Sequence, residues 1–197
     1  MQKRHENLRN LAIKNAQNRI STHGLHGLNS RFIAKKIACS VGTLYNLFKS
    51  IDFLIFAVNL KTLSTLETLL QQAADTSEKG ELALQAMANT YINFARSNPH
   101  LWLTLFEHQF TNTEDTPQDY YEQRTSLFHI LESQLQHIHP ELPLQHIAIE
   151  ARALWAGIHG ICMLNITNKL NDDGYTLQDI AATLVAKFTT QHQGGAV

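Results

Sequence analysis

Glycine, proline and cysteine are all scarce in this sequence of 197 residues, and each scarcity excludes a class of protein. Nine glycines and four prolines are too few turn-forming residues for a many-stranded β architecture. The two cysteines, Cys39 and Cys162, lie far apart and form neither a disulfide framework nor a zinc motif, which favours a reducing cytoplasm. No apolar run approaches about 18 residues, so we expect no membrane span. The charged N-terminus MQKRHENLRN lacks the apolar core of a secretory signal.

Charge is distributed unevenly along the chain. The net charge is −1, but residues 1–50 carry nine lysines and arginines against the single acid Glu6, a net charge of +8. The remaining residues carry seven bases against sixteen acids, a net charge of −9. This asymmetry predicts a basic module that meets a polyanion, joined to an acidic body that does not. The alternative interpretation is a basic helix that is merely solvated.

Hydrophobic residues make up 44% of the sequence, and their spacing predicts an all-α fold with a sizeable core. The expected N-terminal helices cover residues 3–23, about 31–38, and Val41–Phe48. Ser30 or Asn29 is placed to cap the second of these helices, and Ser40 is placed to cap the third. Two short helices joined by about three residues, after a longer helix, form a helix-turn-helix arrangement.

Helical spacing continues through the rest of the chain, with polar or proline-containing breaks between the segments. The further expected helices cover residues 52–74, 81–97, 100–110, 119–138, 144–170 and 177–188. We therefore expect a helix-turn-helix domain over residues 1–50, with its motif at about 29–48, a second domain over 51–190, and a disordered tail over 191–197.

The third short helix carries the side chains that suit contact with a nucleic acid. Val41, Leu44 and Phe48 share its inner face, whereas the outward polar side chains can hydrogen-bond to phosphates or base edges. Gly42 removes a Cβ where the backbone can approach a phosphate. The expected DNA-binding residues are Arg31, Lys36, Ser40, Thr43, Leu44, Tyr45, Asn46 and Lys49.

The stretch Ser30–Leu54, SRFIAKKIACSVGTLYNLFKSIDFL, resembles the DNA-binding signature of the tetracycline-repressor (TetR) family. The matching residues are Ile33-Ala34-Lys35, Ser40, Gly42-Thr43-Leu44-Tyr45 and Phe48. Farther on, Arg152–Leu164, RALWAGIHGICML, is similar to the Trp-x-x-x-His-Gly segment in one branch of the family's C-terminal domains, and Tyr91–Phe106 fits the same branch. The resemblance implies about nine helices. Helices 1–3 would bind DNA, and helices 4–9 would bind a ligand and form a homodimer through the last two, about residues 144–190.

The sequence departs from the family pattern at two positions. Ala38 stands in the turn where the family often has glycine, which predicts a turn without a positive φ. Ile51 stands where the family often has lysine, which removes a phosphate contact at the start of the fourth helix.

The resemblance further implies a repressor that binds a near-palindromic operator and is released by a small-molecule effector. Large aromatic and polar side chains in the acidic body suit an apolar or aromatic effector. The expected ligand-binding residues are Tyr91, Phe94, Trp102, Phe106, Phe110, Phe128, Trp155, His159 and Met163. The alternative for each of these residues is an ordinary place in the hydrophobic core.

Other functions have less support in the sequence. Eleven histidines raise the question of a metal, but HExxH is absent, so we expect neither a metal nor a cofactor. Acid–base pairs, a nucleophile elbow and glycine-rich phosphate loops are missing, so we expect no enzyme. Two alternatives stay open: a protein-interaction module whose basic helices dock on an acidic partner, and a helical cofactor-binding enzyme that uses His159. Cys39 is either an oxidation-sensitive thiol or a small buried residue.

Overall fold

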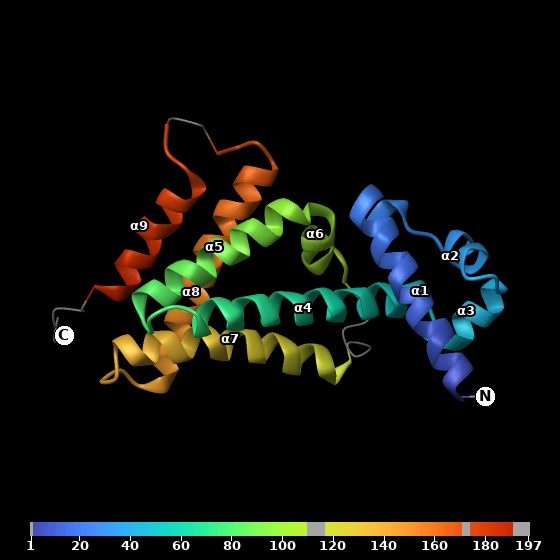
Figure 1. The fold of residues 1–197 in the computed structure, drawn as a ribbon, viewed down its shortest axis with the longest axis horizontal. Coiled ribbons are helices and arrows are strands. Elements are labelled where there is room, and N and C mark those ends of the chain that lie inside the picture. Colours follow the sequence, from blue (N-terminus) through green and yellow to red (C-terminus); the bar gives the residue numbers. More distant parts are fainter. Residues whose placement is uncertain (1, 110–116, 171–173, 191–197) are drawn as a thin grey trace. The chain divides into compact units, whose positions relative to one another are not determined.

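A computed structural model describes residues 2–109, 117–170 and 174–190, and within these ranges the chain is all helical. This confirms the predicted fold class (Figure 1). The described elements, in chain order, are α1 (Gln2–His23), the 3-10 turn η1 (Leu25–Gly27), α2 (Ser30–Lys36), α3 (Val41–Phe48), α4 (Ile51–Asp75), α5 (Glu81–Ser97), α6 (Pro99–Glu107), α7 (Gln118–Ile138), α8 (Leu144–Ile166) and α9 (Leu177–Thr189).

By packing, the chain forms two compact units. The first unit combines Met1–Thr65 with Asn98–Tyr121, and the second combines Leu66–Ser97 with Glu122–Val197. Both α4 and α7 therefore contribute to each unit, and α6 packs against α1 in the first. The expected functional division near residue 50 stays a prediction, and the tail over 191–197 lies outside the described residues.

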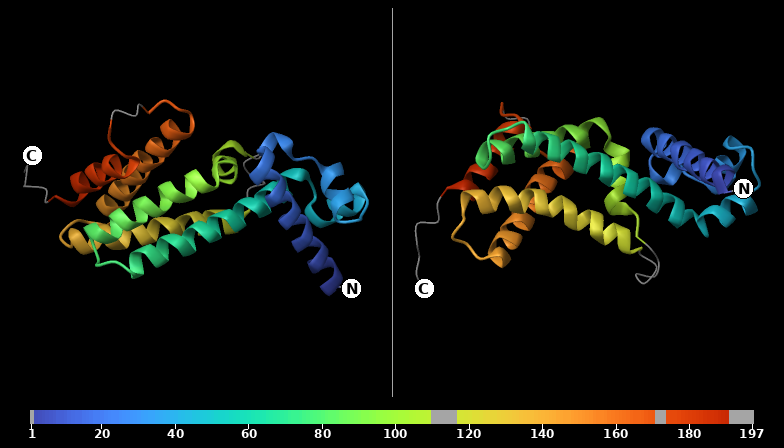
Figure 2. Two further views of the ribbon diagram at one scale, coloured as in Figure 1. Left: turned by 45° about the horizontal axis from the view of Figure 1, so that its top comes forward. Right: turned by 60° about the horizontal axis from the view of Figure 1, so that its bottom comes forward.

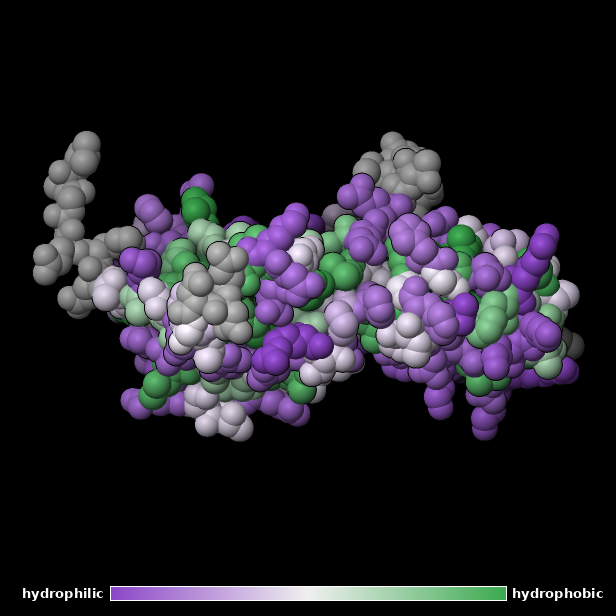
Figure 3. Space-filling view, turned by 90° about the horizontal axis from the view of Figure 1, so that it is seen from above, coloured by the Kyte–Doolittle hydropathy of each residue, from purple (hydrophilic) through white to green (hydrophobic). Residues whose placement is uncertain are grey.

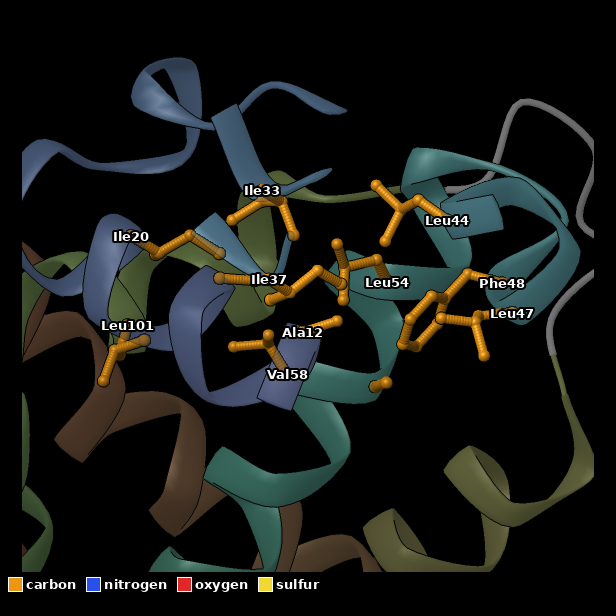
Figure 4. Packing of buried hydrophobic residues seen from close by; sticks show 12 residues of the cluster. Ala12, Ile20, Ile33, Ile37, Leu44, Leu47, Phe48, Leu54, Val58 and Leu101 are labelled. Atoms are coloured by element: carbon orange, nitrogen blue, oxygen red, sulfur yellow. The ribbon is translucent and has the colours of Figure 1, made fainter. Parts of the chain in front are cut away.

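The core of the first unit forms where α1, α2, α3 and the start of α4 meet. Ala12, Ala16 and Ile20 of α1 recur at intervals of four and are completely buried, so one stripe of α1 faces the other helices. Ile33 and Leu44 meet this stripe, and Leu101 of α6 packs at its far end (Figure 4). Burying an Ile or Leu side chain contributes about 1.5–3 kcal/mol, so this cluster fixes how α2 and α3 are presented.

The turn between α2 and α3 has a definite hydrogen-bonding pattern. The N–H of Cys39 donates to the carbonyl of Ala34 (2.9 Å), and the N–H of Ala38 donates to that of Lys35 (3.3 Å). Both bonds are those of a Schellman motif, which requires a left-handed residue after the helix. Ala38 takes that role with φ 54°, so the expectation of a turn without a positive φ is wrong. The same motif ends α2 at Lys36, before the expected residue 38.

In the second unit, α5, α8 and α9 pack against one another. Gly157 of α8 permits a close approach, because a Cβ there would lie 2.5 Å from Cδ2 of Leu184 on α9. Figures 1 and 2 show α7 alongside α4.

Both ends of α9 are fixed by side-chain hydrogen bonds. Its first turn is closed by reciprocal bonds between Thr176 and Asp179, which form a capping box. Near the C-terminal end of α9, Nε2 of His139 donates to the carbonyl of Phe188 (2.9 Å).

Helix α8 ends four residues earlier than expected. The N–H of Lys169 donates to the carbonyl of Leu164 (2.8 Å), and Asn168 has φ 53°. This is again a left-handed stop, and asparagine tolerates that conformation better than most residues. The expected turn over residues 171–175 lies partly outside the described residues.

Two helices, α4 and α8, are long and apolar enough to cross a membrane by length and composition alone. Each has an 18-residue window with a mean hydropathy of 1.4, of which 56% is buried in α4 and 33% in α8. Core helices often pass this test, so the finding is weak evidence for a membrane span. On the face drawn in Figure 3, hydrophobic side chains lie scattered among hydrophilic ones.

Candidate functional site

Helix α3 presents a polar face and buries an apolar one. Gly42, Tyr45, Asn46 and Lys49 are exposed, and Thr43 is half-buried at the edge of this face. The opposite face carries Leu44, Leu47 and Phe48, which are all buried. Leu44 is 1% exposed, which corrects its inclusion among the expected DNA-binding residues. Its side chain holds α3 in the core and cannot reach a ligand outside.

The start of α3 is fixed by its cap. Oγ of Ser40 accepts a bond from the N–H of Thr43 (2.9 Å) and lies 2.9 Å from Oγ1 of Thr43. The structure thus confirms Ser40 as the predicted cap of α3, and this cap brings the hydroxyls of Ser40 and Thr43 together at the start of the helix.

Tyr45 joins α3 to α2 while remaining accessible. Its hydroxyl donates to Oγ of Ser30 (3.2 Å), and its side chain is 40% exposed. On α2, Arg31 and Lys36 are exposed, and Nζ of Lys36 lies 5.7 Å from the centre of the Phe32 ring. The expected DNA-binding residues apart from Leu44 are thus at least partly accessible in the helix-turn-helix segment.

Lys49 has an unusual backbone conformation at the end of α3. Its φ is 62° and its ψ is −51°, and the N–H of Ser50 donates to the carbonyl of Phe48 across it (2.7 Å). This is a three-residue γ-turn, which is strained for a residue other than glycine. The Nζ of Lys49 lies 5.3 Å from the centre of the Phe53 ring. The Lys49 side chain therefore lies against the first turn of α4.

Two arginines counted in the basic segment have structural partners. The guanidinium of Arg9 donates to the carbonyl of Leu47 (3.1 Å) and lies over the Phe48 ring, 4.5 Å from its centre. Arg19 donates to the carbonyl of Gly27 (3.0 Å) and lies over the Phe32 ring. Both arginines bind α1 to the helix-turn-helix segment. The sequence alone does not distinguish Arg9 and Arg19 from basic residues whose side chains face the solvent.

The second unit contains an apolar cavity of about 40 Å³. Its wall comes from five helices and is lined by Leu70, Leu84, Met87, Ala88, Tyr91, Leu131, Leu154, Trp155, Ile158 and Val185. Of the nine expected ligand-binding residues, Tyr91 and Trp155 line it. The other lining residues carry smaller apolar side chains, which are equally common in an ordinary hydrophobic core. Their residue types therefore did not identify them as cavity-lining residues in the sequence.

An aromatic cluster borders this cavity. Trp155 makes an edge contact with Phe128 (ring centres 5.6 Å apart) and a tilted contact with His159 (5.2 Å). The hydroxyl of Tyr91 lies 3.1 Å from Nδ1 of His159. Burial lowers the pKa of His159 below its ordinary value, so the imidazole is neutral at pH 7 and its Nδ1 can accept a hydrogen bond from the Tyr91 hydroxyl.

The remaining expected ligand-binding residues lie elsewhere. Trp102 is completely buried in the first unit, where its ring contacts Phe106 with centres 5.1 Å apart. Phe94 and Met163 belong to the second unit but do not line the cavity. Phe110 lies outside the described residues. The structure therefore does not bring the nine side chains together in one pocket.

The two cysteines differ in environment. Cys39 is half-buried in the turn before α3, and its thiol lies 3.3 Å from the carbonyl of Ser40. Cys162 is buried in α8, and burial raises the pKa of its thiol to about 12. Within the part of the chain that the structure describes, no three His, Cys, Asp or Glu side chains are grouped as metal ligands.

Comparison with known proteins identifies the relatives of this chain. Residues 84–188 match the family model described as "Tetracyclin repressor-like, C-terminal domain". No curated protein matches the sequence.

Solved structures resemble the fold over nearly the whole chain. One is a protein of unknown function from Rhodococcus sp. RHA1, with a TM-score of 0.78 and 18% identity, covering 92% of this chain and 93% of that one. Another is a TetR transcriptional regulator from the same organism, with a TM-score of 0.69, 14% identity and coverage of 98% and 100%. A third is the transcriptional regulator FadR from Bacillus subtilis in complex with stearoyl-CoA, with a TM-score of 0.69, 16% identity and coverage of 91% and 97%.

The structural likeness establishes the fold, and the family model covers more than half of the sequence. Together with the capped helix-turn-helix segment, these matches show that the chain belongs to the tetracycline-repressor (TetR) family of transcriptional regulators.

Proposed function

We propose that this regulator binds a near-palindromic DNA operator as a homodimer and represses transcription until a small apolar or aromatic effector releases it. The observation that carries the proposal is the exposed polar face of α3, with Tyr45, Asn46 and Lys49, set in a segment of net charge +8. Side chains of these types bond to phosphates and base edges in the major groove. The basic charge supplies affinity that does not depend on sequence.

A homodimer explains how short helices reach sufficient affinity and specificity. Two copies of α3 would enter successive major grooves about 34–36 Å apart, which requires a two-fold-related operator. Arg31 and Lys36 on α2 would contact the flanking phosphates, and the Ser40 cap would place a hydroxyl beside the backbone. The Leu44 side chain supports this face from within the core.

The proposed dimer contact lies on α8 and α9. The most apolar window of α8 has a mean hydropathy of 1.4, yet only 33% of it is buried within one chain. Ile149 is 57% exposed and Leu164 is 42% exposed on this helix. Covering such a face with a second copy removes apolar surface from water, at about 25 cal/mol per Å². Arg152 of α8 pairs with Glu132 of α7 within the same chain (2.8 Å).

The proposed effector site is the apolar cavity with its aromatic border. At about 40 Å³ it holds a few water molecules at most, whereas pockets that bind drug-sized ligands measure about 300–1,000 Å³. An effector must therefore displace side chains of α4, α5, α7 or α8. A ligand that binds an expanded state better than the compact one shifts the equilibrium between them. The stearoyl-CoA bound by the Bacillus subtilis regulator supports an effector with a large apolar part.

The test is a titration of the full-length protein with DNA from upstream of its own gene, between about 50 and about 200 mM salt. We expect affinity to fall steeply with salt while preference for one sequence survives. Tyr45→Ala should weaken binding roughly tenfold, the loss of one or two hydrogen bonds, and leave the dimer and the helix content intact. Tyr175→Ala, at a tyrosine that is 44% exposed outside the helix-turn-helix segment, is the matched control.

Two results would contradict the proposal. Equal affinity for the operator and for heparin would favour a general polyanion-binding module. A monomer that binds DNA without sequence preference would exclude binding of a two-fold-symmetric dimer to a near-palindromic operator.

Assignment to the branch with a Trp…His-Gly segment also stays a prediction, because the matched model describes the C-terminal domain in general terms.

A further inference from the structure

A second hollow, of about 210 Å³, lies in the second unit where α4 meets α7. We call it the polar groove, and it is lined by Gln71, Ser126, His129, Ile130, Ser133 and Gln134. Five of these six residues carry hydrogen-bonding side chains. The apolar cavity described above is lined by side chains without hydrogen-bonding groups, apart from Tyr91 and Trp155, so the two hollows suit different parts of a ligand.

The polar groove and the apolar cavity share one wall. On α4, Leu70 lines the cavity and the next residue, Gln71, lines the groove. On α7, Ile130 lines the groove and the next residue, Leu131, lines the cavity. Leu70 is 5% exposed and Ile130 is 8% exposed. Consecutive residues on both α4 and α7 thus line the two hollows, and a ligand that occupies both requires the buried side chains of Leu70 and Ile130 to move.

Two carboxylates, those of Glu67 and Glu132, lie beside the polar groove. Neither lysine nor arginine is among its lining residues. Glu67 lies one turn before Gln71 on α4, and its carboxylate accepts a hydrogen bond from Oγ of Ser126. On the other side, Oε2 of Glu132 lies 3.9 Å from Nε2 of His129. Arg152 pairs with Glu132 (2.8 Å) and offsets its charge, so Glu67 is the carboxylate that would repel a carboxylate or phosphate in the groove.

The lining groups instead suit an uncharged polar group. Gln134 is 7% exposed, and its Oε1 accepts a bond from the N–H of Gly80 (3.1 Å). This bond fixes the orientation of the amide, with its NH₂ group directed away from Gly80. The hydroxyl of Ser133 can donate and accept, whereas Oγ of Ser126, which donates to Glu67, and the amide oxygen of Gln71, whose NH₂ group donates to Asp75 (2.8 Å), can accept. An alcohol or an amide can meet these groups without a charge.

We propose that the polar groove and the apolar cavity together bind an uncharged amphipathic effector. Its hydroxyl- or amide-bearing head lies in the groove, and its apolar part enters the cavity between Leu70 and Leu131. The proposal rests on the effector-binding function proposed above and names the ligand class. Glu67 acts in it as the specificity-determining residue that disfavours amphiphiles with a carboxylate head.

The experiment is calorimetric titration of the full-length protein with octanamide and with octanoate, which share a chain and differ in the charge of the head. We expect octanamide to bind at least about tenfold more tightly, a difference of about 1.4 kcal/mol. Glu67→Gln should strengthen octanoate binding and bring the two affinities closer together, while octanamide affinity changes little. The double variant Gln71→Leu/Ser133→Val should weaken octanamide binding.

Gln72→Leu is the matched control, because Gln72 is exposed on α4 beside Gln71 and does not line the groove. Equal binding of the two probes, binding of neither, or octanamide affinity unchanged in the double variant would each overturn the proposal. These titrations contain no DNA, and the operator titration contains no octanamide. Failure of the ligand class is therefore distinguishable from failure of the DNA-binding function.

Discussion

The methyl group of Ala38 is an unfavourable feature of the turn between α2 and α3. A left-handed conformation costs an L-residue about 1–2 kcal/mol, and Ala38 adopts it with φ 54° while exposed to solvent. Ala38→Gly removes this strain, offset in part by the greater freedom of glycine in the unfolded chain. We expect the free energy of unfolding to rise by about 1 kcal/mol, measured by urea denaturation.

Ala38→Val is the matched control for this prediction. A β-branched side chain tolerates a positive φ less well than alanine does, so stability should fall. Because Ala38 is exposed, neither substitution changes core packing. If both variants had the stability of the wild type, the left-handed turn would not be present in solution.

His159 makes stability depend on pH. Burial lowers its pKa in the folded state, so the unfolded state binds the proton more readily once the pH falls toward the ordinary histidine value. The stabilisation is present above that value and is lost as the pH falls below it. The free energy of unfolding of the wild type should therefore fall between about pH 7.5 and about pH 5.5. His159→Gln, which can still bond to Tyr91, should reduce this fall.

Urea denaturation at the two pH values checks the prediction, with His146→Gln as the control at an exposed histidine. His108 contributes a fall of the same sign that should remain in His159→Gln, because burial lowers its pKa more than the neighbouring Asp52 raises it. A wild-type fall no larger than that of His159→Gln would show that His159 is as easily protonated folded as unfolded.

Residue types identify candidate groups but not their partners. The polar residues of α3 were predictable because helical periodicity assigns each position to a face. Arg9 and Arg19 were indistinguishable from outward-facing cations, because the carbonyls and rings that they contact come from distant parts of the chain. Leu44 was expected both in the core and among the DNA-binding residues, and burial decides for the core.

At the scale of elements, starts of helices were predicted better than ends. Ser40 caps α3 as expected, and Asn29 caps α2 by accepting from the N–H of Phe32 (2.8 Å). Caps depend on nearby residue types, which the sequence shows directly. The ends of α2 and α8 were placed too late, because Ala38 and Asn168 occupy stops that glycine more often fills.

Two substitutions at Ser40, the cap of α3, should affect the free energy of unfolding and the DNA affinity differently. Ser40→Ala removes the bond to the N–H of Thr43 and should lower the free energy of unfolding by about 1 kcal/mol. Ser40→Asp keeps an acceptor at the cap and a favourable charge at the helix start, so stability should stay near that of the wild type. Its carboxylate would nevertheless lie beside a DNA phosphate and abolish most of the affinity.

Urea denaturation and operator titration of the two variants check this prediction. Ser21, whose hydroxyl donates to the carbonyl of Asn18 near the end of α1, offers a control through Ser21→Asp. Equal DNA affinity of Ser40→Asp and the wild type would place the start of α3 away from the DNA.

At the scale of the molecule, the sequence predicted the helices but not which of them pack together. Helix α6 belongs with α1 in the first unit, which takes Trp102 and Phe106 away from the cavity. Helical periodicity shows that an aromatic residue is buried, but tertiary packing decides which neighbours it has. The cavity wall was therefore predicted in part, through Tyr91 and Trp155.

The proposed dimer predicts that one exposed apolar residue on α8 controls assembly. Leu164→Glu places a charge at a position that is 42% exposed in one chain and would be buried between two. We expect sedimentation of a monomer and operator affinity reduced at least about a hundredfold, because one head binds alone. Leu82→Glu, at a leucine on α5 that is 53% exposed, is the control and should remain dimeric.

The unequal burial of the two thiols gives the unmodified chain a selective attachment point. A maleimide probe reacts with a thiolate, which Cys162 with a pKa of about 12 does not supply near neutral pH, whereas Cys39 is partly accessible beside α3. A spin label attached there would mark each head of an assembled pair. The distance between the two labels, recorded with and without a candidate effector, would then report directly whether the heads move apart.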